Sequence, residues 1–379
     1  MTAEHTPVVV AARRTPQGKE DGVFADVRSE DLSIAVIEAL LEETGLTGED
    51  VDDLQWGCAQ QRGEQDNNLA RVIALLSDLG ENVPAATINR WCASSMESIV
   101  NGANAIRAGQ RDVVVAGGVE SMTRVPMLGG YEHLHPALND HYNVASLQMG
   151  MTAEKVAEEF DISREAQDEY ALQSQRRAAE ATDESRFADQ IVPVETDEGV
   201  IEEDEGIRRD TNLEKLASLS PVFAGDGTVT AGNASQISDG AAGVVLTNES
   251  VAEERGLPIL GRVGQYQVAG VDPTVMGIGP VPATRKLLEI TGREIDDYDL
   301  VELNEAFASQ TVYAQRKLGV PTDRFNVNGG AIAIGHPLGA SGARLPVTLL
   351  HELDRRDGER GIATLCVGFG QGAAVEFSR

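Results

Sequence analysis

The sequence predicts an α/β fold built from two similar halves in tandem, and two observations lead to this prediction: the composition and an internal repeat. The chain has 379 residues, of which 41% are hydrophobic, 4% are aromatic and 39 are glycine. Such a chain can bury a sizeable core of small aliphatic side chains, and its glycines permit many tight turns. The same composition excludes collagen, coiled coils and wholesale disorder.

Two distant segments share one local pattern, which is the basis for expecting tandem halves. Residues 40–45 read Leu-Leu-Glu-Glu-Thr-Gly, and residues 287–292 read Leu-Leu-Glu-Ile-Thr-Gly. Each segment closes an amphipathic helix, and paired aspartates and an apolar strand follow it. We therefore expect one supersecondary plan to occur twice.

Each half also contains a strand end, a helix and a further strand in the same order. Pro346 lies inside the second of these helices and predicts either a kink or a later helix start. The segments are 86–89, 93–108 and 112–116 in the first half, and 325–328, 339–353 and 361–367 in the second.

The region between the two halves does not follow the plan that they share. We therefore expect the chain to consist of three parts. We predict an N-terminal half completed by a returning buried strand, an inserted region, and a C-terminal half. Their bounds are 1–118 completed by 239–257, 119–238, and 258–379.

The predicted insert contains a histidine-rich loop, a helix and an acidic run. Ser163 is the expected N-cap of the helix, and residues 202–205 form the run, which we interpret as a solvated surface. A metal site would require the three histidines to converge, whereas a polar loop over a substrate entrance is the simpler interpretation. These histidines are His133, His135 and His141.

The net charge of −30 at pH 7 argues against a general attraction to nucleic acid or to an anionic membrane. High salt screens such self-repulsion, because the Debye length falls to about 3 Å at 1 M. We hypothesise a salt-loving host with a saline cytosol.

The amino terminus and the cysteines indicate a cytoplasmic protein. The chain enters the apolar stretch 8–10 without a basic and apolar leader, and no apolar run is long enough to span a membrane. Its cysteines, Cys58, Cys92 and Cys366, are odd in number and lack the spacing of a zinc site. We expect neither a disulfide framework nor a metal site.

Cys92 lies where a predicted strand passes into a helix. The first turn of a helix offers free N–H groups and the positive end of the helix dipole, which lower the pKa of a thiol. The sequence therefore predicts an exposed, activated nucleophile. Alternatively, Cys92 is a small packing residue.

His336 stands in a glycine-rich segment, 326–344, which contains five glycines. Glycine allows the backbone to approach another group closely, and histidine can accept a thiol proton at neutral pH. A phosphate-cradling loop, or a turn in which His336 caps a backbone group, is the alternative.

Two more predicted strand ends carry candidate residues. Cys366 ends a strand and is followed by alternate glycines, whose amides could stabilise negative charge on oxygen. Asn304 follows an apolar strand and could hold a water or cap the next helix. Buried packing is the alternative for Cys366.

Taken together and in order, these motifs resemble the thiolases, the family that makes or cleaves 3-ketoacyl-CoA. The likeness covers essentially the whole chain. Its most specific parts are residues 328–343 and 366–372. The resemblance implies a five-layered αβαβα thiolase fold of two similar halves, with a loop domain inserted in the first half. The other motifs that carry it are Asn89 with Cys92, 117–122 and 304–307.

The resemblance also implies roles for individual residues. Cys92 takes the place of the acyl-accepting nucleophile, His336 that of its base, and Cys366 that of the second acid/base. Asn304 would position a water, and the amides of Cys92 and Gly368 would hold the tetrahedral oxygen. The implied coenzyme A contacts are Arg208, Ser235, Phe307 and Met149.

The implied reaction is acyl transfer between a cysteine and coenzyme A, by cleavage of 3-ketoacyl-CoA or the reverse condensation. Coenzyme A is then a substrate, no tightly bound cofactor is expected, and the family implies a homodimer or homotetramer. Gln148 and Gln236 depart from the short-chain acetoacetyl-CoA thiolases, which favours the broader activity over that alternative.

Other classes remain as alternatives. A non-catalytic CoA-binding scaffold is expected to have lost Cys92 or His336, and both are present. Ketosynthases and HMG-CoA synthases are disfavoured, because Cys366 stands where the former carry a second histidine. We interpret Cys58 as a packing residue. The sequence leaves open the acyl chain length, the physiological direction and the need for a partner protein.

Overall fold

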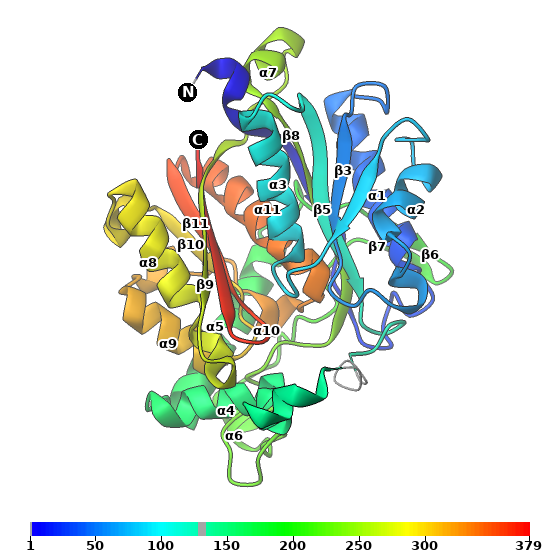
Figure 1. Ribbon diagram of the computed structural model, residues 1–379. Helices are drawn as coiled ribbons and strands as arrows, with labels where there is room; N and C mark the ends of the chain where they lie inside the picture. Colours follow the sequence, from blue (N-terminus) through cyan, green and yellow to red (C-terminus); the bar gives the residue numbers. More distant parts are fainter. Residues whose placement is uncertain (1, 128–133) are drawn as a thin grey trace.

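The computed structural model describes residues 2–127 and 134–379, which form a mixed α/β fold (Figure 1). The strands are β1 (Pro7–Arg14), β2 (Gly18–Lys19), β3 (Asp53–Gly57), β4 (Ala85–Ile88), β5 (Val113–Ser121), β6 (Val194–Thr196), β7 (Gly199–Ile201), β8 (Ser238–Asn248), β9 (Gly261–Gly270), β10 (Leu300–Leu303), β11 (Arg360–Val367) and β12 (Gln371–Ser378). The α-helices are α1 (Ser29–Thr44), α2 (Leu69–Leu76), α3 (Ser94–Arg107), α4 (Met149–Glu159), α5 (Arg164–Asp183), α6 (Leu213–Ala217), α7 (Glu249–Arg255), α8 (Pro280–Thr291), α9 (Ala308–Leu318), α10 (Ala331–Ile334) and α11 (Leu338–Arg356).

The two halves of the fold repeat one sheet plan. The large sheet has the order β10-β11-β12-β9-β1-β8-β5-β3-β4. In the first half β3 runs parallel to β4 and β5, and β8 lies antiparallel between β5 and β1. In the second half β10 runs parallel to β11, and β12 lies antiparallel between β11 and β9. The halves join where Val8 and Val9 of β1 pair with β9.

Helices cover the outer face of the sheet in each half, and two further helices fill the space between the halves. Figure 1 shows α3 and α11 in the centre, between the strands of the two halves. Helix α1 packs on the first half, and α8 packs on β9 and β12 of the second half. The resulting succession of helices, strands, helices, strands and helices confirms the five-layered fold.

The internal repeat predicted two helix ends correctly. Helices α1 and α8 end one residue before Gly45 and Gly292, and both glycines adopt a φ of 66°. This left-handed conformation favours glycine and closes a helix.

In the second half, one of the two alternatives for Pro346 is excluded, and one predicted strand end is shorter than expected. Helix α11 begins at Leu338 and passes through Pro346, so its start is not displaced beyond the proline. The strand end expected at 325–328 is reduced to a single bridge between Phe325 and Val301.

The inserted region between β5 and β8 contains α4, α5, α6 and the hairpin β6-β7. Ser163 caps α5 as predicted, because its Oγ accepts a hydrogen bond from the amide of Ala166 at 3.2 Å. The precise domain boundaries stay a prediction. Within the described residues, every helix is too short or too polar to cross a lipid bilayer.

The acidic run at 202–205 is only partly the solvated surface that the sequence predicted. Asp204 is buried and accepts two hydrogen bonds from the buried guanidinium of Arg14, at 2.7 and 2.9 Å. Glu205 accepts from the amides of Lys19 and Val23. The prediction was wrong for these two residues, because each satisfies buried or partly buried donors of the first half.

The two central helices approach each other closely near their N-termini. A Cβ atom added to Gly342 of α11 would lie 2.5 Å from the backbone nitrogen of Met96 in α3. The amide of Ala343 donates a hydrogen bond across the same interface to Ser95 Oγ at 2.8 Å. Only glycine at position 342 permits this separation.

We predict that Gly342→Ala destabilises the protein by about 1–3 kcal/mol, because the new methyl group meets backbone atoms that cannot turn aside. Denaturant unfolding of the variant and the wild type measures this. The matched control is Gly225→Ala, since a Cβ atom at Gly225 has no heavy atom within 4 Å. Equal unfolding midpoints for the two variants would contradict the close-approach argument.

Candidate active site

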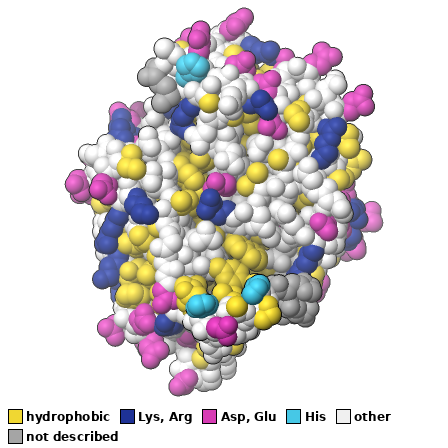
Figure 2. Space-filling model, in the orientation of Figure 1, with side chains coloured by type: hydrophobic (Ala, Val, Ile, Leu, Met, Phe, Trp, Pro, Cys, Tyr) yellow, Lys and Arg dark blue, Asp and Glu magenta, His cyan; other side chains and the backbone are white. Residues whose placement is uncertain are grey.

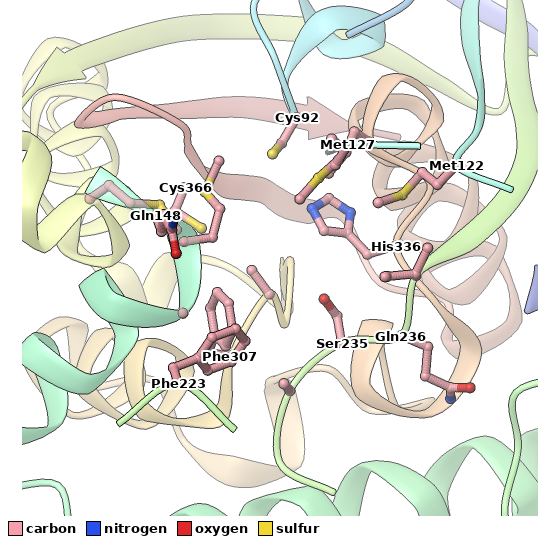
Figure 3. A pocket seen from close by; sticks show the side chains of 17 residues that line it. Cys92, Met122, Met127, Gln148, Phe223, Ser235, Gln236, Phe307, His336 and Cys366 are labelled. Carbon is pink, nitrogen blue, oxygen red and sulfur yellow. The ribbon is translucent and has the colours of Figure 1, made fainter. Parts of the chain in front are cut away.

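A cavity of about 500 Å³ brings the predicted catalytic side chains of both halves together (Figure 3). Cys92 reaches it from the first half, and His336 and Cys366 reach it from the second. The predicted coenzyme contacts Met149, Ser235 and Phe307 also line the wall. The remaining lining residues are Met122, Met127, Gln148, Gly150, Phe223, Ala234, Gln236, Ile237, Met276, Ala306 and Leu338.

A tight turn presents Cys92 to the cavity, two residues before α3 begins. Trp91 adopts a φ of 47°, which is uncommon for a bulky side chain, and its amide donates to Asn89 Oδ1 at 2.9 Å. The amides of Gly368 and of Cys92 itself face the sulfur. This turn and the residue after β11 together place two backbone donors beside the thiol.

The environment of Cys92 corrects one prediction. The residue is only 4% exposed, and burial raises the pKa of its thiol to about 12. The sequence predicted an exposed cysteine with a lowered pKa, but desolvation outweighs the favourable backbone amides. Cys92 is therefore a thiol in the free protein and needs a base to remove its proton.

Cys366 lies near the end of β11 and is buried. Burial and the neighbouring Cys92 sulfur raise the pKa of its thiol. The rings of Trp91 and Phe369, 5.6 Å apart, pack the two cysteine loops together. A Cβ atom at Gly368 would lie 2.8 Å from Met149 Cε, so glycine leaves room for that side chain in the wall.

His336 lies between α10 and α11 and is buried at the cavity wall. Its Nδ1 is 2.6 Å from Ser341 Oγ, and Asn304 Nδ2 lies 3.2 Å from Nε2. Burial, together with the positive charge of Arg344, lowers the pKa of His336 to about 3. The imidazole is therefore neutral at physiological pH and able to accept a proton.

Three predicted site residues lie outside the cavity wall as the structure describes it. Asn304 is buried behind His336, and Gly368 contributes its amide rather than a lining atom. Arg208 is exposed, and its Nη1 lies 3.4 Å from the carbonyl oxygen of Ala231, near the Ser235 segment.

The alternative of a metal site at the three histidines receives no support from the described residues. His135 and His141 are both exposed, and His135 Nδ1 accepts from the amide of Ala137. His133 lies outside the described residues. In residues 2–127 and 134–379, no group of three or more potential metal ligands converges.

Sequence reasoning did not assign a role to Glu120, although an acidic residue in the apolar strand β5 is a recognisable signal. The Glu120 carboxylate is buried and accepts from the amides of Ala59, Gln60 and Gly339 at 2.8–3.0 Å. Gln65 Nε2 donates to it at 2.6 Å. Glu120 thus ties the first turn of α11, which follows His336, to the first half. Cys58, predicted to pack, is buried beside it.

Comparisons with known proteins show the family of the chain. The N-terminal domain model of thiolases matches residues 7–250, and the C-terminal domain model matches residues 257–379. The chain is 46% identical to a 3-ketoacyl-CoA thiolase of Marinomonas sp. (strain MWYL1), with 98% of each chain covered.

Solved structures show the same fold. Over 100% of both chains and at 41% identity, the structure resembles an acetyl-CoA acetyltransferase of Bacillus anthracis, with a TM-score of 0.92. Human mitochondrial 3-ketoacyl-CoA thiolase gives a TM-score of 0.91 at the same identity and coverage. The chain belongs to the thiolase family.

The raised pKa of Cys92 predicts how its alkylation depends on pH. Because the thiolate is the nucleophile, its alkylation by iodoacetamide should accelerate about tenfold per pH unit between about pH 7 and 10. Peptide mass spectrometry identifies the alkylated cysteine, and Cys92→Ser is the control. A plateau with a midpoint near about pH 8.5, the ordinary thiol value, would contradict the effect of burial.

Proposed function

We propose that the protein is a thiolase that cleaves 3-ketoacyl-CoA into acetyl-CoA and a shortened acyl-CoA, and that also runs the reverse condensation. The observation that carries this proposal is that Cys92, His336 and Cys366 line one cavity although they come from opposite halves. Two thiols and one neutral imidazole supply a nucleophile, a base and a second acid for carbon–carbon bond cleavage.

In the first step, the Cys92 sulfur attacks the 3-keto carbon while His336 accepts the thiol proton. The bond between C2 and C3 breaks, and its electron pair leaves as the enolate of acetyl-CoA. His336 and a water held by Asn304 stabilise the enolate oxygen, and Cys366 protonates C2. Acetyl-CoA departs, and the shortened acyl group stays on Cys92 as a thioester.

In the second step, free coenzyme A attacks this thioester after Cys366 has removed its thiol proton. The amides of Cys92 and Gly368, which face the Cys92 sulfur, stabilise the tetrahedral oxygen. Collapse of this intermediate releases the shortened acyl-CoA, and His336 returns its proton to the departing Cys92 sulfur, which regenerates the thiol.

The wall of the cavity supports a route for coenzyme A. Met149, Ser235 and Phe307 line it and would contact the pantetheine arm. Arg208 lies exposed near the Ser235 segment and would attract the anionic nucleotide end. Coenzyme A is a substrate in this proposal.

A biosynthetic acetoacetyl-CoA thiolase restricted to short chains is the second candidate. Gln148 lines the cavity at the position where the sequence departs from that group, and Met122 and Met127 add flexible apolar wall. Flexible methionine side chains adapt to acyl groups of different size, which favours the broader activity. A non-catalytic scaffold is disfavoured because Cys92 and His336 both face the cavity.

Trapping the acyl-enzyme tests the proposed function directly. Incubation with acetyl-CoA should add one acetyl group to the peptide that contains Cys92, because this thiol is the nucleophile of the second half-reaction run in reverse. Cys92→Ser should lose the adduct and the thiolysis activity. Cys58→Ser is the matched control and should retain both. An adduct on another residue, or none in the wild type, would overturn the proposal.

The cellular setting is proposed from composition and surface. Figure 2 shows acidic side chains scattered over the face in view, in keeping with the net charge of −30 and with a saline cytoplasm. We infer a homodimer or homotetramer as well. Leu75 and Leu76 of α2 are 52% and 62% exposed, and β4 lies at the end of the sheet, so this face offers apolar area to a second copy.

If the host is salt-loving, dialysis from about 1 M KCl into millimolar salt should unfold or inactivate the enzyme, because the Debye length grows and the acidic surface repels itself. Circular dichroism and thiolysis rate measure the outcome. Glycerol added to the low-salt buffer is the control, since an uncharged solute does not screen charge. Full activity in millimolar salt would refute the halophilic hypothesis.

A further inference from the structure

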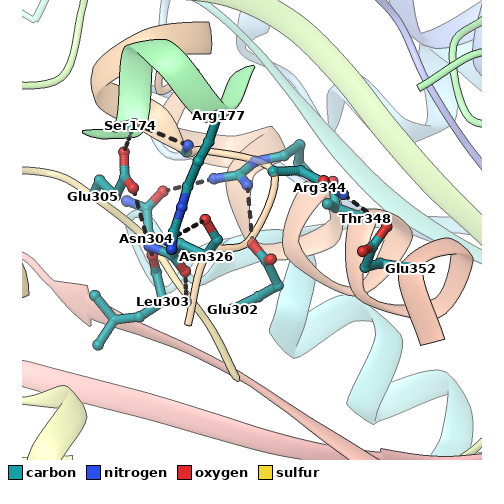
Figure 4. A network of polar contacts seen from close by, with 12 residues as sticks. Ser174, Arg177, Glu302, Leu303, Asn304, Glu305, Asn326, Arg344, Thr348 and Glu352 are labelled. Carbon is teal, nitrogen blue, oxygen red and sulfur yellow. Dashed lines mark hydrogen bonds and ion pairs between the residues drawn. The ribbon is translucent and has the colours of Figure 1, made fainter. Parts of the chain in front are cut away.

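We propose that Arg344 is a positioning residue, which locks the Asn304 amide so that its NH₂ group faces His336 and keeps the ring in the tautomer with Nε2 unprotonated. The catalytic consequence rests on the proposed function, whereas the tautomer itself does not. Hydrogen bonds lead to the His336 ring from two sides, and Figure 4 shows the first of them, the contact between Arg344 and Asn304.

The first fixed end is the Arg344 guanidinium, which can only donate hydrogen bonds. Its Nη2 lies 3.2 Å from Asn304 Oδ1, so the oxygen of this amide must point toward Arg344. The NH₂ group then points to His336, with Asn304 Nδ2 at 3.2 Å from Nε2 and 3.4 Å from Nδ1. Such networks are what assign the two ends of an asparagine amide.

The second fixed end is the carbonyl oxygen of Pro337, which can only accept. Ser341 Oγ lies 2.8 Å from it, and we assign its single hydroxyl proton to this contact. The oxygen of Ser341 is therefore the acceptor for His336 Nδ1, 2.6 Å away. In this arrangement Nδ1 carries the proton of the neutral ring, and Nε2 keeps its lone pair. The NH₂ group of Asn304, which lies at similar distances from both ring nitrogens, agrees with this tautomer because it presents donors to the ring.

The burial of Arg344 argues that its role is to orient Asn304 rather than to stabilise the fold. The side chain is 1% exposed, and its contact with Glu302 is a loose one, with Nη1 and Oε2 4.0 Å apart. Among the described residues, its Nε and Nη1 have no hydrogen-bond partner, and Glu302 Oε2 has none either. The one hydrogen bond that this guanidinium makes within the described part of the chain goes to Asn304, which is the amide that it orients.

The tautomer decides which proton transfer is open to His336. With Nδ1 protonated and held by Ser341, Nε2 can accept the proton of Cys92. If the Asn304 amide turned over, its oxygen would face the ring and favour a protonated Nε2, which cannot act as the base. In another histidine-dependent enzyme, loss of the group that sets the tautomer lowers kcat by about 10⁴.

The test is ¹⁵N NMR of the full chain labelled at histidine, with the His336 resonances identified by their loss in His336→Asn. The wild type should show a protonated Nδ1 and an unprotonated Nε2. Arg344→Lys keeps the positive charge but loses the planar guanidinium, so the Asn304 amide should no longer be held in one orientation. The His336 ¹⁵N signals should then move toward those of a mixture of the two tautomers. Arg355→Lys, on the same helix and paired with Glu352, is the matched control and should leave them unchanged.

Steady-state thiolysis provides the second measurement. Arg344→Lys should lower kcat by about 10- to 100-fold, as for other partners that orient a histidine, with KM roughly unchanged. If Arg344→Lys does not fold, the double variant Arg344→Met with Glu302→Gln takes its place in both measurements. This double variant removes both buried ionisable groups together. A protonated Nε2 in the wild type, or wild-type tautomer and kcat in the Arg344 variants, would overturn the proposal. A wild type that shows the tautomer but no thiolysis would instead overturn the proposed function.

Discussion

The close approach of α3 and α11 is the constraint on which the site depends. Cys92 lies just before α3 and His336 just before α11, so the distance between these helices sets the distance between nucleophile and base. Gly342 allows contact with the backbone of α3, and the hydrogen bond from Ala343 to Ser95 fixes its position. Glu120 adds a buried tie from β5 to the first turn of α11. The two halves of the fold thus hold the N-termini of α3 and α11 close together.

Burial controls the chemistry of the assembled site. The pKa of Cys92 is raised to about 12 and that of His336 is lowered to about 3, so both side chains are neutral before substrate arrives. Neutral groups are stable in an apolar cavity, whereas a thiolate–imidazolium pair would be costly there. We therefore propose that the proton of Cys92 moves only when attack on a carbonyl carbon begins, and that the two backbone amides beside the sulfur stabilise the charge that forms on oxygen.

Local patterns in the sequence predicted much of the fold, because they depend on neighbouring residues. The glycines that close α1 and α8, the Ser163 cap and the buried strand β8 all follow from such patterns. Contacts between residues far apart in the chain could not be predicted from such local patterns. The pairing of Asp204 with Arg14 and the contact of Arg344 with Asn304 exist only after folding. The pKa of Cys92 was predicted in the wrong direction, because the sequence shows the nearby helix start but not the depth of burial.

The central claim is that one carbonyl group is held between Cys92, Cys366 and the amide of Gly368. A crystal structure of the enzyme soaked with acetyl-CoA and flash-cooled measures this arrangement most directly. We predict an acetyl group on Cys92 Sγ, with its oxygen within hydrogen-bond distance of the Cys92 and Gly368 amides and its methyl carbon facing the Cys366 sulfur. An acetyl group on Cys366, or one on Cys92 whose oxygen points away from both amides, would contradict the account.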